Sequence, residues 1–193
     1  SSIPFVVSDA ADVVAEVTAC ALQDAGLVHS SAEELASAVA YFGGQELLSP
    51  SRDRLAGFRQ ALRSAGLLEQ PGTVVERDYQ RSSGRAMMAE WHAQHAGQLP
   101  KVLFAGGIAL LEGVLAELQS GKLLGRTLNG QRTMNLIAFD DHPLLDCLPL
   151  PVTSIAQDAR RLAQASLSMV LAVMRGEQPA AVWVPAVIRQ RNA

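Results

Sequence analysis

With 193 residues, of which 49% are apolar, the chain is long and hydrophobic enough for one globular domain, or for one domain and part of a second. Its formal net charge is −3 and it has no basic stripe, so these residues alone are not expected to build a nucleic-acid-binding surface. We also expect no membrane span and no signal peptide, because no apolar run reaches the about 20 residues of a membrane helix and the N-terminus lacks a basic region before an apolar core.

The first half of the chain alternates predicted strands with predicted helices. Short apolar runs indicate strands, and amphipathic spacing indicates helices. Gly26 and Gly66 each follow a predicted helix and are expected to end it. The predicted strands are 5–9, 39–42 and 74–75. The predicted helices are 11–25, a second stretch that is capped by Ser30 or Ser31, 49–65, which is capped by Ser49 or Ser51, and 85–95, which is opened by Ser82 or Ser83.

The second half continues the alternation. Strands separated by helices of this length indicate βαβ units, so the fold class we expect is α/β, with a mostly parallel sheet flanked by helices. The predicted strands are 102–105, 136–139 and a closing pair around Pro185, 182–184 with 187–188. The predicted helices are 108–119 and 155–174. A loop that contains Gly121, Gly125 and Gly130 precedes strand 136–139.

The predicted helix 155–174 has apolar residues around much of its circumference. A helix of this kind needs cover on a wide face. Because it follows the proline-rich crossover Pro149-Leu150-Pro151, it suits a second lobe, most of which is missing from this sequence. Our hypothesis is that another chain, or residues outside this sequence, cover the face.

The two cysteines, Cys20 and Cys147, lie far apart and match neither a metal-binding nor a redox spacing. We expect two reduced, buried thiols. His92 and His95 lie three apart on a predicted helix, a spacing that can hold a metal, but surface positions are the simpler interpretation, and no further ligands cluster beside Asp140, Asp141 and His142. The sequence therefore predicts no metal site and no cofactor.

The paired carboxylates Asp140 and Asp141, with His142 next to them, follow the apolar run 134–139, which is typical of a buried strand. Ligands of open α/β sheets bind outside the carboxyl ends of the strands. Such a group can bind a metal, perform acid–base catalysis or accept hydroxyl hydrogen bonds. A metal needs further ligands and catalysis needs a nucleophile, so hydroxyl recognition is the simplest interpretation. The alternative is a capped loop with solvated carboxylates.

A second group lies between a glycine pair and the predicted helix 49–65. Ser49 and Ser51 stand at the helix start, where free N–H groups and the helix dipole favour anions, and Arg54 is placed to clamp an anion in bidentate fashion. This pattern suits a phosphate or a carboxylate. The alternative is ordinary capping by the serines, with Arg54 solvated or paired to Asp53 or Glu46. No Walker motif is present.

Two further loops carry candidate ligand-binding residues. Tyr79 is able to stack on a sugar ring and Arg81 to bind an anion; the alternative is a surface loop that caps the next helix. Gly106 and Gly107 follow the predicted strand 102–105 and would let a ligand approach the backbone; the alternative is a tight strand-to-helix turn.

A set of short segments follows in a fixed order along the chain: Val7-Ser8-Asp9, Phe42-Gly43-Gly44, 54–62, 103–110, Phe139-Asp140-Asp141 and 151–158. In this order, they resemble the effector-binding domain of the lactose-repressor (LacI/GalR) family of bacterial transcription regulators. Segments 46–51, 109–114 and 144–152 are most similar to the fructose-type repressors within that family, the fructose catabolite regulators and sucrose-operon repressors. Most family members carry a polar pair such as Asn-Asp where this chain has Gly106-Gly107, and the fructose group departs there as well.

The resemblance implies a two-lobed, periplasmic-binding-protein-like fold of type I with the effector between the lobes. Residues 1–150 would form the C-terminal lobe, 151–177 a crossover and helix of a mostly absent N-terminal lobe, and 178–193 a strand segment returning to the C-terminal lobe. The DNA-binding helix-turn-helix has no counterpart in this sequence. The implied ligand-binding residues are Ser49, Ser51 and Arg54 for the sugar or its phosphate, and Asp140 or Asp141, beside His142, for the hydroxyls; Tyr79, Arg81 and Gly107 complete the expected site.

We therefore expect a domain that binds fructose or phosphorylated fructose and belongs to a cytoplasmic, homodimeric transcriptional repressor, without catalytic activity and without a membrane partner. Operator DNA would bind only through the helix-turn-helix outside this sequence. The alternative is a periplasmic sugar-binding protein of a transport system, and the residues that precede Ser1 would distinguish the two. A small α/β enzyme is a more distant alternative, because no nucleophile–base pair is visible.

Overall fold

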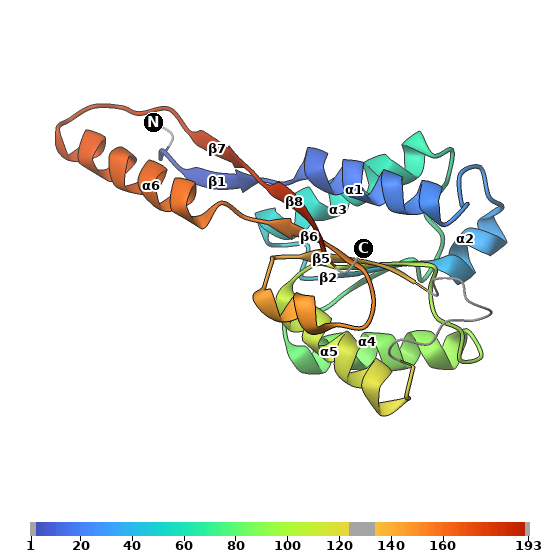
Figure 1. Cartoon of the computed structure of the whole chain (residues 1–193). Coiled ribbons are helices and arrows are strands. Elements are labelled where there is room, and N and C mark those ends of the chain that lie inside the picture. Colours follow the sequence, from blue (N-terminus) through green and yellow to red (C-terminus); the bar gives the residue numbers. More distant parts are fainter. Residues whose placement is uncertain (1–2, 124–133, 192–193) are drawn as a thin grey trace.

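The computed structural model describes residues 3–123 and 134–191, so Gly125 and Gly130 of the predicted loop lie outside the described residues. Its larger part is built on a six-stranded sheet with the order β3-β2-β4-β5-β6-β8 (Figure 1). The strands are parallel except for β8, which is antiparallel to β6. This confirms the predicted α/β class with a mostly parallel sheet. The strands are β1 Val6–Asp9, β2 Val39–Gly43, β3 Val74–Glu76, β4 Val102–Ala105, β5 Asn135–Phe139, β6 Val152–Ala156, β7 Val182–Pro185 and β8 Val187–Arg191.

Helices cover both faces of this sheet (Figure 1). Helices α1 and α3 pack together on one face, and α4 and α5 pack together on the other. The helices are α1 Ala11–Asp24, α2 Ala32–Ala38, α3 Ser49–Ser64, α4 Arg81–Gln94, α5 Ile108–Ser120 and α6 Ala159–Met174, with a short 3₁₀ helix, η1, at Pro143–Cys147.

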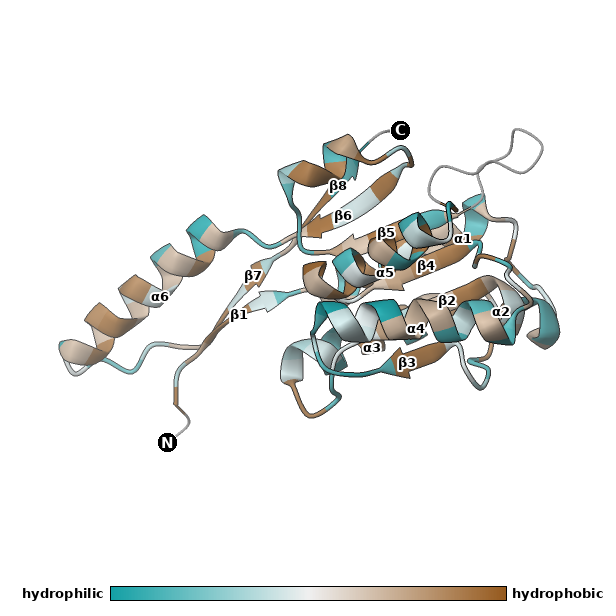
Figure 2. Cartoon of the chain, turned by 90° about the horizontal axis from the view of Figure 1, so that it is seen from below, coloured by the Kyte–Doolittle hydropathy of each residue, from teal (hydrophilic) through white to brown (hydrophobic). Residues whose placement is uncertain are grey.

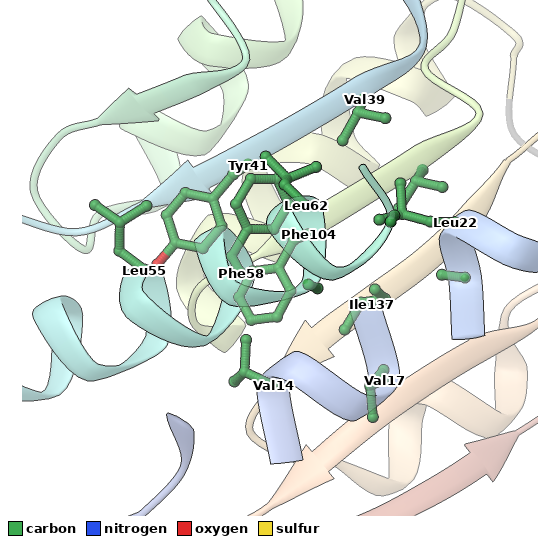
Figure 3. Packing of buried hydrophobic residues seen from close by; sticks show 14 of the residues in the cluster. Val14, Val17, Leu22, Val39, Tyr41, Leu55, Phe58, Leu62, Phe104 and Ile137 are labelled. Carbon is green, nitrogen blue, oxygen red and sulfur yellow. The ribbon is translucent and has the colours of Figure 1, made fainter. Parts of the chain in front are cut away.

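The strand period of two divides the core between these faces. In β2, Val39 and Tyr41 belong to the cluster on the α1/α3 side, whereas Ala40 and Phe42 belong to the cluster on the α4/α5 side. On the α1/α3 side Tyr41 stacks on Phe104 with 5.0 Å between ring centroids (Figure 3). Every residue of β2 is buried, and burying one large apolar side chain is worth about 1.5–3 kcal/mol.

The predicted ends of the helices agree with the structure better than their predicted starts do. Gly26 and Gly66 end their helices with φ of +67° and +72°, as predicted, and Ser31 caps α2 by accepting from the Glu34 N–H. The expectation of a serine cap on α3 is wrong, since Leu48 holds the cap position without a side-chain bond. Helix α4 begins at Arg81, one turn before the predicted start, because residues 81–83 already form its first turn.

The predicted helix 155–174 is too long at its start. Residues 152–156 form β6, whose β-branched side chains pack in the sheet beside β5. Helix α6 begins only at Ala159, after Asp158, which accepts a hydrogen bond from the Arg161 N–H as its N-cap. The change from strand to helix therefore occurs at Gln157 and Asp158.

A smaller part consists of a parallel two-stranded pair, β1 with β7, and helix α6, which packs against it. It projects from the end of the large sheet, as Figures 1 and 2 show. The predicted closing pair around Pro185 is wrong, because β7 pairs with β1 while β8 pairs with β6. Strand β6 lies in the large sheet, whereas β1 and β7 lie outside it.

Helix α6 leaves most of its apolar residues exposed, and only Met169 and Ala172 are buried. Figure 2 shows the hydrophobic residues gathered toward its far end. Trp183 on β7 and Phe5 pack edge to face with 5.4 Å between centroids, and both remain about half exposed. The exposed large apolar residues of α6 are Leu167, Val170, Leu171, Val173 and Met174.

Cys20 and Cys147 are free and exposed, so the expectation of buried thiols is wrong. Cys20 lies on α1 and Cys147 at the end of η1. Among the helices of residues 3–123 and 134–191, none has both the length and the apolar character needed to cross a bilayer.

Candidate functional site

Three adjacent strands of the large sheet, β2, β4 and β5, end at the same edge. They are parallel, and the register pairs Phe42 with Ala105 and Ala105 with Ala138. The carboxyl ends of these strands, marked by Phe42, Phe104 and Phe139, therefore lie side by side. The loops that follow these strands bring the residues discussed below to one rim, outside the carboxyl ends of the strands.

Arg54 is the central charged group at this rim. It lies on α3 and is only 9% exposed. Its Nη1 donates to the Gly106 carbonyl and to the Tyr79 hydroxyl, the latter at 3.2 Å, and its Cζ lies 3.6 Å from the centroid of the Phe139 ring. Its Nε is buried without a hydrogen-bond partner among the described residues. Within that part of the chain, no carboxylate lies within 4.0 Å of the guanidinium.

Tyr79 lies in a slot made by two glycines. A Cβ at Gly44 would come within 2.0 Å of the Tyr79 ring, and one at Gly107 would come within 3.1 Å of it. The Tyr79 hydroxyl lies 2.9 Å from Ser51 Oγ and accepts from Arg54. The glycines thus admit the ring, and the ring holds Arg54 and Ser51 in place.

The first turn of α3 offers fewer free N–H groups than the sequence suggests. Pro50 has no N–H, and the N–H groups of Ser51 and Arg52 both donate to the Leu48 carbonyl. Ser49 is exposed, and Ser51 is fully buried against Tyr79. Anion binding at this rim would therefore depend on the Arg54 side chain more than on the helix terminus.

The two aspartates after β5 have different surroundings. Asp140 has a left-handed φ of +73°, which aspartate tolerates better than most residues, and its Oδ1 accepts from Gln157 Nε2 at 2.7 Å. Asp141 is clamped: its Oδ1 accepts from Arg191 Nε at 2.8 Å and from Ser154 Oγ at 2.6 Å, and its Oδ2 accepts from Arg191 Nη2 at 2.9 Å. The bonds from Arg191, followed by that from Ser154, hold the pKa of Asp141 below its usual range.

The remaining predicted residues face elsewhere. His142 is exposed and caps η1, since its Nδ1 accepts from the Leu144 N–H at 3.2 Å. Arg81 is exposed at the first position of α4. The rim thus brings together Ser51, Arg54, Tyr79, Gly107 and Asp140, but neither His142 nor Arg81.

An open hollow of about 360 Å³ lies in front of this group. Arg54 and Asp140 supply charged groups of opposite sign, and the rest of the lining is mainly apolar. Such a surface suits a ligand with hydroxyl groups and an apolar ring face. Within the described part of the chain, no three His, Cys, Asp or Glu side chains gather closely enough to hold a metal ion. The other lining residues are Leu48, Pro50, Tyr79, Gly107, Ile108 and Ala109.

Sequence reasoning assigned no role to two residues that the site uses, Phe139 and Gln157. Phe139 places its ring under the Arg54 guanidinium, and Gln157 holds Asp140. From the sequence, Phe139 is only the end of a buried strand. The bond between Gln157 and Asp140 has no local sequence signal, because the two residues lie 17 positions apart.

Comparison with known proteins adds independent findings. The family described as a periplasmic binding protein-like domain matches residues 32–191. The sucrose operon repressor of Klebsiella pneumoniae is 35% identical over 194 residues, which cover 100% of this chain and 53% of that protein. The fructose operon regulatory protein of Vibrio cholerae is 33% identical over 134 residues, which cover 69% of this chain and 38% of that protein. The chain thus spans about half the length of the first of these relatives and less of the second.

Among solved structures, a similar one is the Cra transcriptional dual regulator from Pseudomonas putida in complex with fructose 1-phosphate. It is 28% identical with a TM-score of 0.75, and the match covers 97% of this chain and 63% of that one. A bacterial regulator crystallised with a sugar phosphate therefore shares the arrangement of strands and helices described here.

Proposed function

We propose a sugar-responsive regulatory role for this chain, which belongs to the family of periplasmic binding protein-like domains and is of the LacI type. It would be part of the effector-binding domain of a transcriptional repressor, with fructose or a phosphorylated fructose as the effector. The observation that carries the proposal is the buried cation Arg54, which has no carboxylate partner among residues 3–123 and 134–191 and shares a hollow with Tyr79 and Asp140. A buried charge of this kind is costly until an anionic or strongly polar ligand compensates it.

Each group at the rim has a role that its surroundings suggest. Tyr79 would stack on the sugar ring, Arg54 would bind a phosphate or hydroxyl oxygen, and Asp140 would accept hydroxyl hydrogen bonds. Asp141, with its oxygens already bound, would hold the loop rather than the sugar. The sucrose and fructose operon regulators among its relatives support a sugar of the fructose type.

The two parts of the fold would belong to two lobes. The large sheet would form most of the C-terminal lobe, and β1, β7 and α6 would belong to an N-terminal lobe completed by residues outside this sequence. The exposed apolar face of α6 supports this assignment, because such a face is stable in water only when covered. The chain passes between the parts after Asp9, at Gln157 and after Pro185, so the effector would lie between the lobes next to these crossings.

Effector binding would act by population shift between two arrangements of the lobes. A helix-turn-helix outside this sequence would bind operator DNA, and two copies would form a homodimer in the cytoplasm. No catalytic step is part of this role. The relatives named above are regulators, which favours regulation over periplasmic transport of the sugar.

The test is calorimetry on the intact native protein with fructose, fructose 1-phosphate and, as a control, glucose 6-phosphate. We expect one of the fructose ligands to bind far more tightly than glucose 6-phosphate. The same ligand should change the affinity for the protein's own upstream DNA in a gel-shift assay. Equal affinity for all three sugars, or no binding, would contradict the proposal.

A further inference from the structure

An open groove of about 470 Å³ lies between helix α1 and the large sheet, a volume in the usual range of ligand pockets. It is formed at the beginning of β5 and β6, whereas the rim around Arg54 lies where the parallel strands end. Strand β8 is antiparallel to β6, so the last residues of β8 complete the groove. The groove is therefore distinct from the hollow in front of Arg54 and lies at the opposite end of the sheet.

The wall that α1 supplies carries a row of polar side chains above an apolar floor. Glu16, Cys20 and Asp24 follow one another at intervals of four residues, which places them on one ridge of the helix. All three residues are exposed. Below them, the floor is made of apolar side chains from the helix and the sheet, namely Val17, Ala21, Ile137 and Ile188.

The groove has an unbalanced negative charge. Within the described part of the chain, neither Glu16 nor Asp24 has an ion-pair partner within 4.0 Å. The lining also contains Arg191, but its guanidinium is already paired with Asp141 and Asp146. A cationic ligand would therefore gain two carboxylates without displacing an existing ion pair.

We propose that this groove binds a linear aliphatic diamine or polyamine. The terminal ammonium groups would bind Glu16 and Asp24, and the methylene chain would lie along the apolar floor beside Cys20. Lysine side chains lie on protein surfaces in the same way, with the apolar stem buried and the charged end in water. The ligand is thus a long, flexible dication with an apolar middle.

The spacing of the two carboxylates favours a long ligand over a single small cation. Eight residues of α-helix rise by about 12 Å, which is too far for Glu16 and Asp24 to share one metal ion. Extended spermidine is long enough to span a rise of about 12 Å, whereas putrescine is about half as long and reaches one carboxylate at a time. Chain length therefore distinguishes this site from a general attraction of cations to acidic residues.

The groove is built from the elements that connect the large sheet to the smaller part of the fold. Helix α1 follows β1, strand β6 leads into α6, and strand β8 follows β7. A ligand held between α1 and the β6 and β8 strands would therefore act on all three connections. Occupation of the groove should shift the equilibrium between arrangements of the two parts and change effector affinity. This consequence rests on the proposed function, whereas binding in the groove does not.

The first experiment is calorimetry on the intact protein at low ionic strength, with spermidine, putrescine and the uncharged chain octanediol as probes. We expect spermidine to bind severalfold more tightly than putrescine, and octanediol not to bind measurably. Glu16→Gln and Asp24→Asn should each weaken spermidine about threefold, and the double variant about tenfold. Glu33→Gln removes the same charge from an exposed position on α2 and should leave the affinity unchanged. Equal affinity for the two amines, or an equal loss in Glu33→Gln, would overturn the proposal.

The two free cysteines locate the bound probe. Cys20 lies in the groove, and Cys147 lies outside it at the end of η1. Diaminooctane at saturation would cover Cys20 with its methylene chain, so alkylation of Cys20 by iodoacetamide should slow at least about threefold while Cys147 reacts at an unchanged rate. Equal slowing at both thiols, or none at Cys20, would place the amine elsewhere and overturn the proposal.

The consequence for the effector is measured by titrating fructose 1-phosphate with and without spermidine. We expect its affinity to change at least about threefold in the unaltered protein, and to stay constant in the double variant of Glu16→Gln and Asp24→Asn. An unchanged affinity in the unaltered protein would overturn the link between the groove and the effector site while the proposed function stands. Failure to bind fructose and fructose 1-phosphate under any condition would instead remove the proposed function, and the spermidine titrations would still decide whether the groove is a binding site.

Discussion

Two arginines at the large sheet, Arg191 and Arg54, have opposite surroundings. Arg191 at the end of β8 donates to both oxygens of Asp141 and also to Asp146. Its side chain is 13% exposed, and that of Asp141 is 12% exposed. Arg54 is as deeply buried, but its partners are neutral, an aromatic ring lies beneath it, and its Nε has no hydrogen-bond partner within the described part of the chain.

The difference separates a structural ion pair from a candidate ligand-binding residue. The Arg191 pair joins β8 to the loop after β5, and Ser154 on β6 adds a third bond to the same carboxylate. An arginine and a carboxylate that already form these hydrogen bonds have few free donors or acceptors for a ligand. Arg54 keeps donors and an uncompensated charge, the condition under which an anionic ligand gains most.

Removing Arg191 should have the largest effect on stability. In Arg191→Met the Asp141 carboxylate keeps its charge and most of its burial but loses its main partner, so we expect the thermal midpoint to fall by several degrees. The pKa of Asp141 is lowered in the folded chain, so its contribution is present above the usual value of 3.8 and is lost as pH falls further. The difference between variant and parent, measured by calorimetric melting, should therefore shrink below that pH.

Arg189→Met is the matched control. Arg189 lies 3.6 Å from the same carboxylate but is 58% exposed, so its loss should change the midpoint much less. Equal losses in the two variants would contradict the distinction between a buried, satisfied pair and a surface contact.

Removing Arg54 should change ligand affinity strongly and ligand-free stability little, in contrast to removing Arg191. Arg54→Met removes an uncompensated buried charge, so the ligand-free protein should melt much closer to the parent than Arg191→Met does. Affinity for fructose 1-phosphate should fall by about 1.5–3 kcal/mol, the usual worth of hydrogen bonds to a charged group. Arg52→Met, at an exposed position of the same helix, is the control. A large loss of ligand-free stability with unchanged affinity would make Arg54 structural.

The sequence predicts the sheet and its binding edge because both depend on local patterns. Apolar runs such as 39–42 and 136–139 indicate buried parallel strands, and parallel strands bring their carboxyl ends to one edge. The placement of Arg54 at that edge follows from its position one turn into the helix after β2. The exposed apolar face of α6 follows from composition alone.

The partners within the site could not be predicted, because they are distant in sequence. Asp141 meets Arg191 across 50 positions, and Tyr79 meets Ser51 across 28. A pair of carboxylates after a strand does not indicate which of the two is already bound by other side chains of the protein. The sequence interpretation starts the helix at Ile155 and so misses β6, although the polar pair Gln157-Asp158 separates β6 from α6 and Asp158 is a usable helix-start signal.

The glycine slot around Tyr79 allows a second test of the Arg54 group, with a smaller expected effect on sugar affinity. Gly44→Ala would place a Cβ within 2.0 Å of the Tyr79 ring, so the ring must move and its bonds to Ser51 and Arg54 weaken. We expect sugar affinity to fall by about 0.5–1.5 kcal/mol, the net worth of a typical hydrogen bond. In a double-mutant cycle with Tyr79→Ala, Gly44→Ala should add little further loss. Additive losses would show that the slot does not act through Tyr79.

Glu76 provides the smallest expected effect, with a pH dependence opposite to that of Asp141. It ends β3 beside Gly43, and its Oε1 is buried without a hydrogen-bond partner among the described residues. Burial, followed by the nearby Glu46, raises the pKa of Glu76 above its usual 4.5. A raised carboxyl pKa favours the folded state below the usual value, and that advantage disappears as pH rises through the folded pKa.

Glu76→Gln keeps the shape of the side chain and removes the titration. The variant should therefore be more stable than the parent at pH 7, by less than about 1 kcal/mol because the side chain is partly exposed. The gain should disappear toward pH 4, whereas the loss in Arg191→Met is largest at neutral pH. Urea unfolding at both pH values measures the two differences. A Glu76→Gln variant that is less stable at pH 7 would indicate that the Glu76 carboxylate has a stabilising partner. The charged groups near Arg54 would then be paired as fully as those near Arg191.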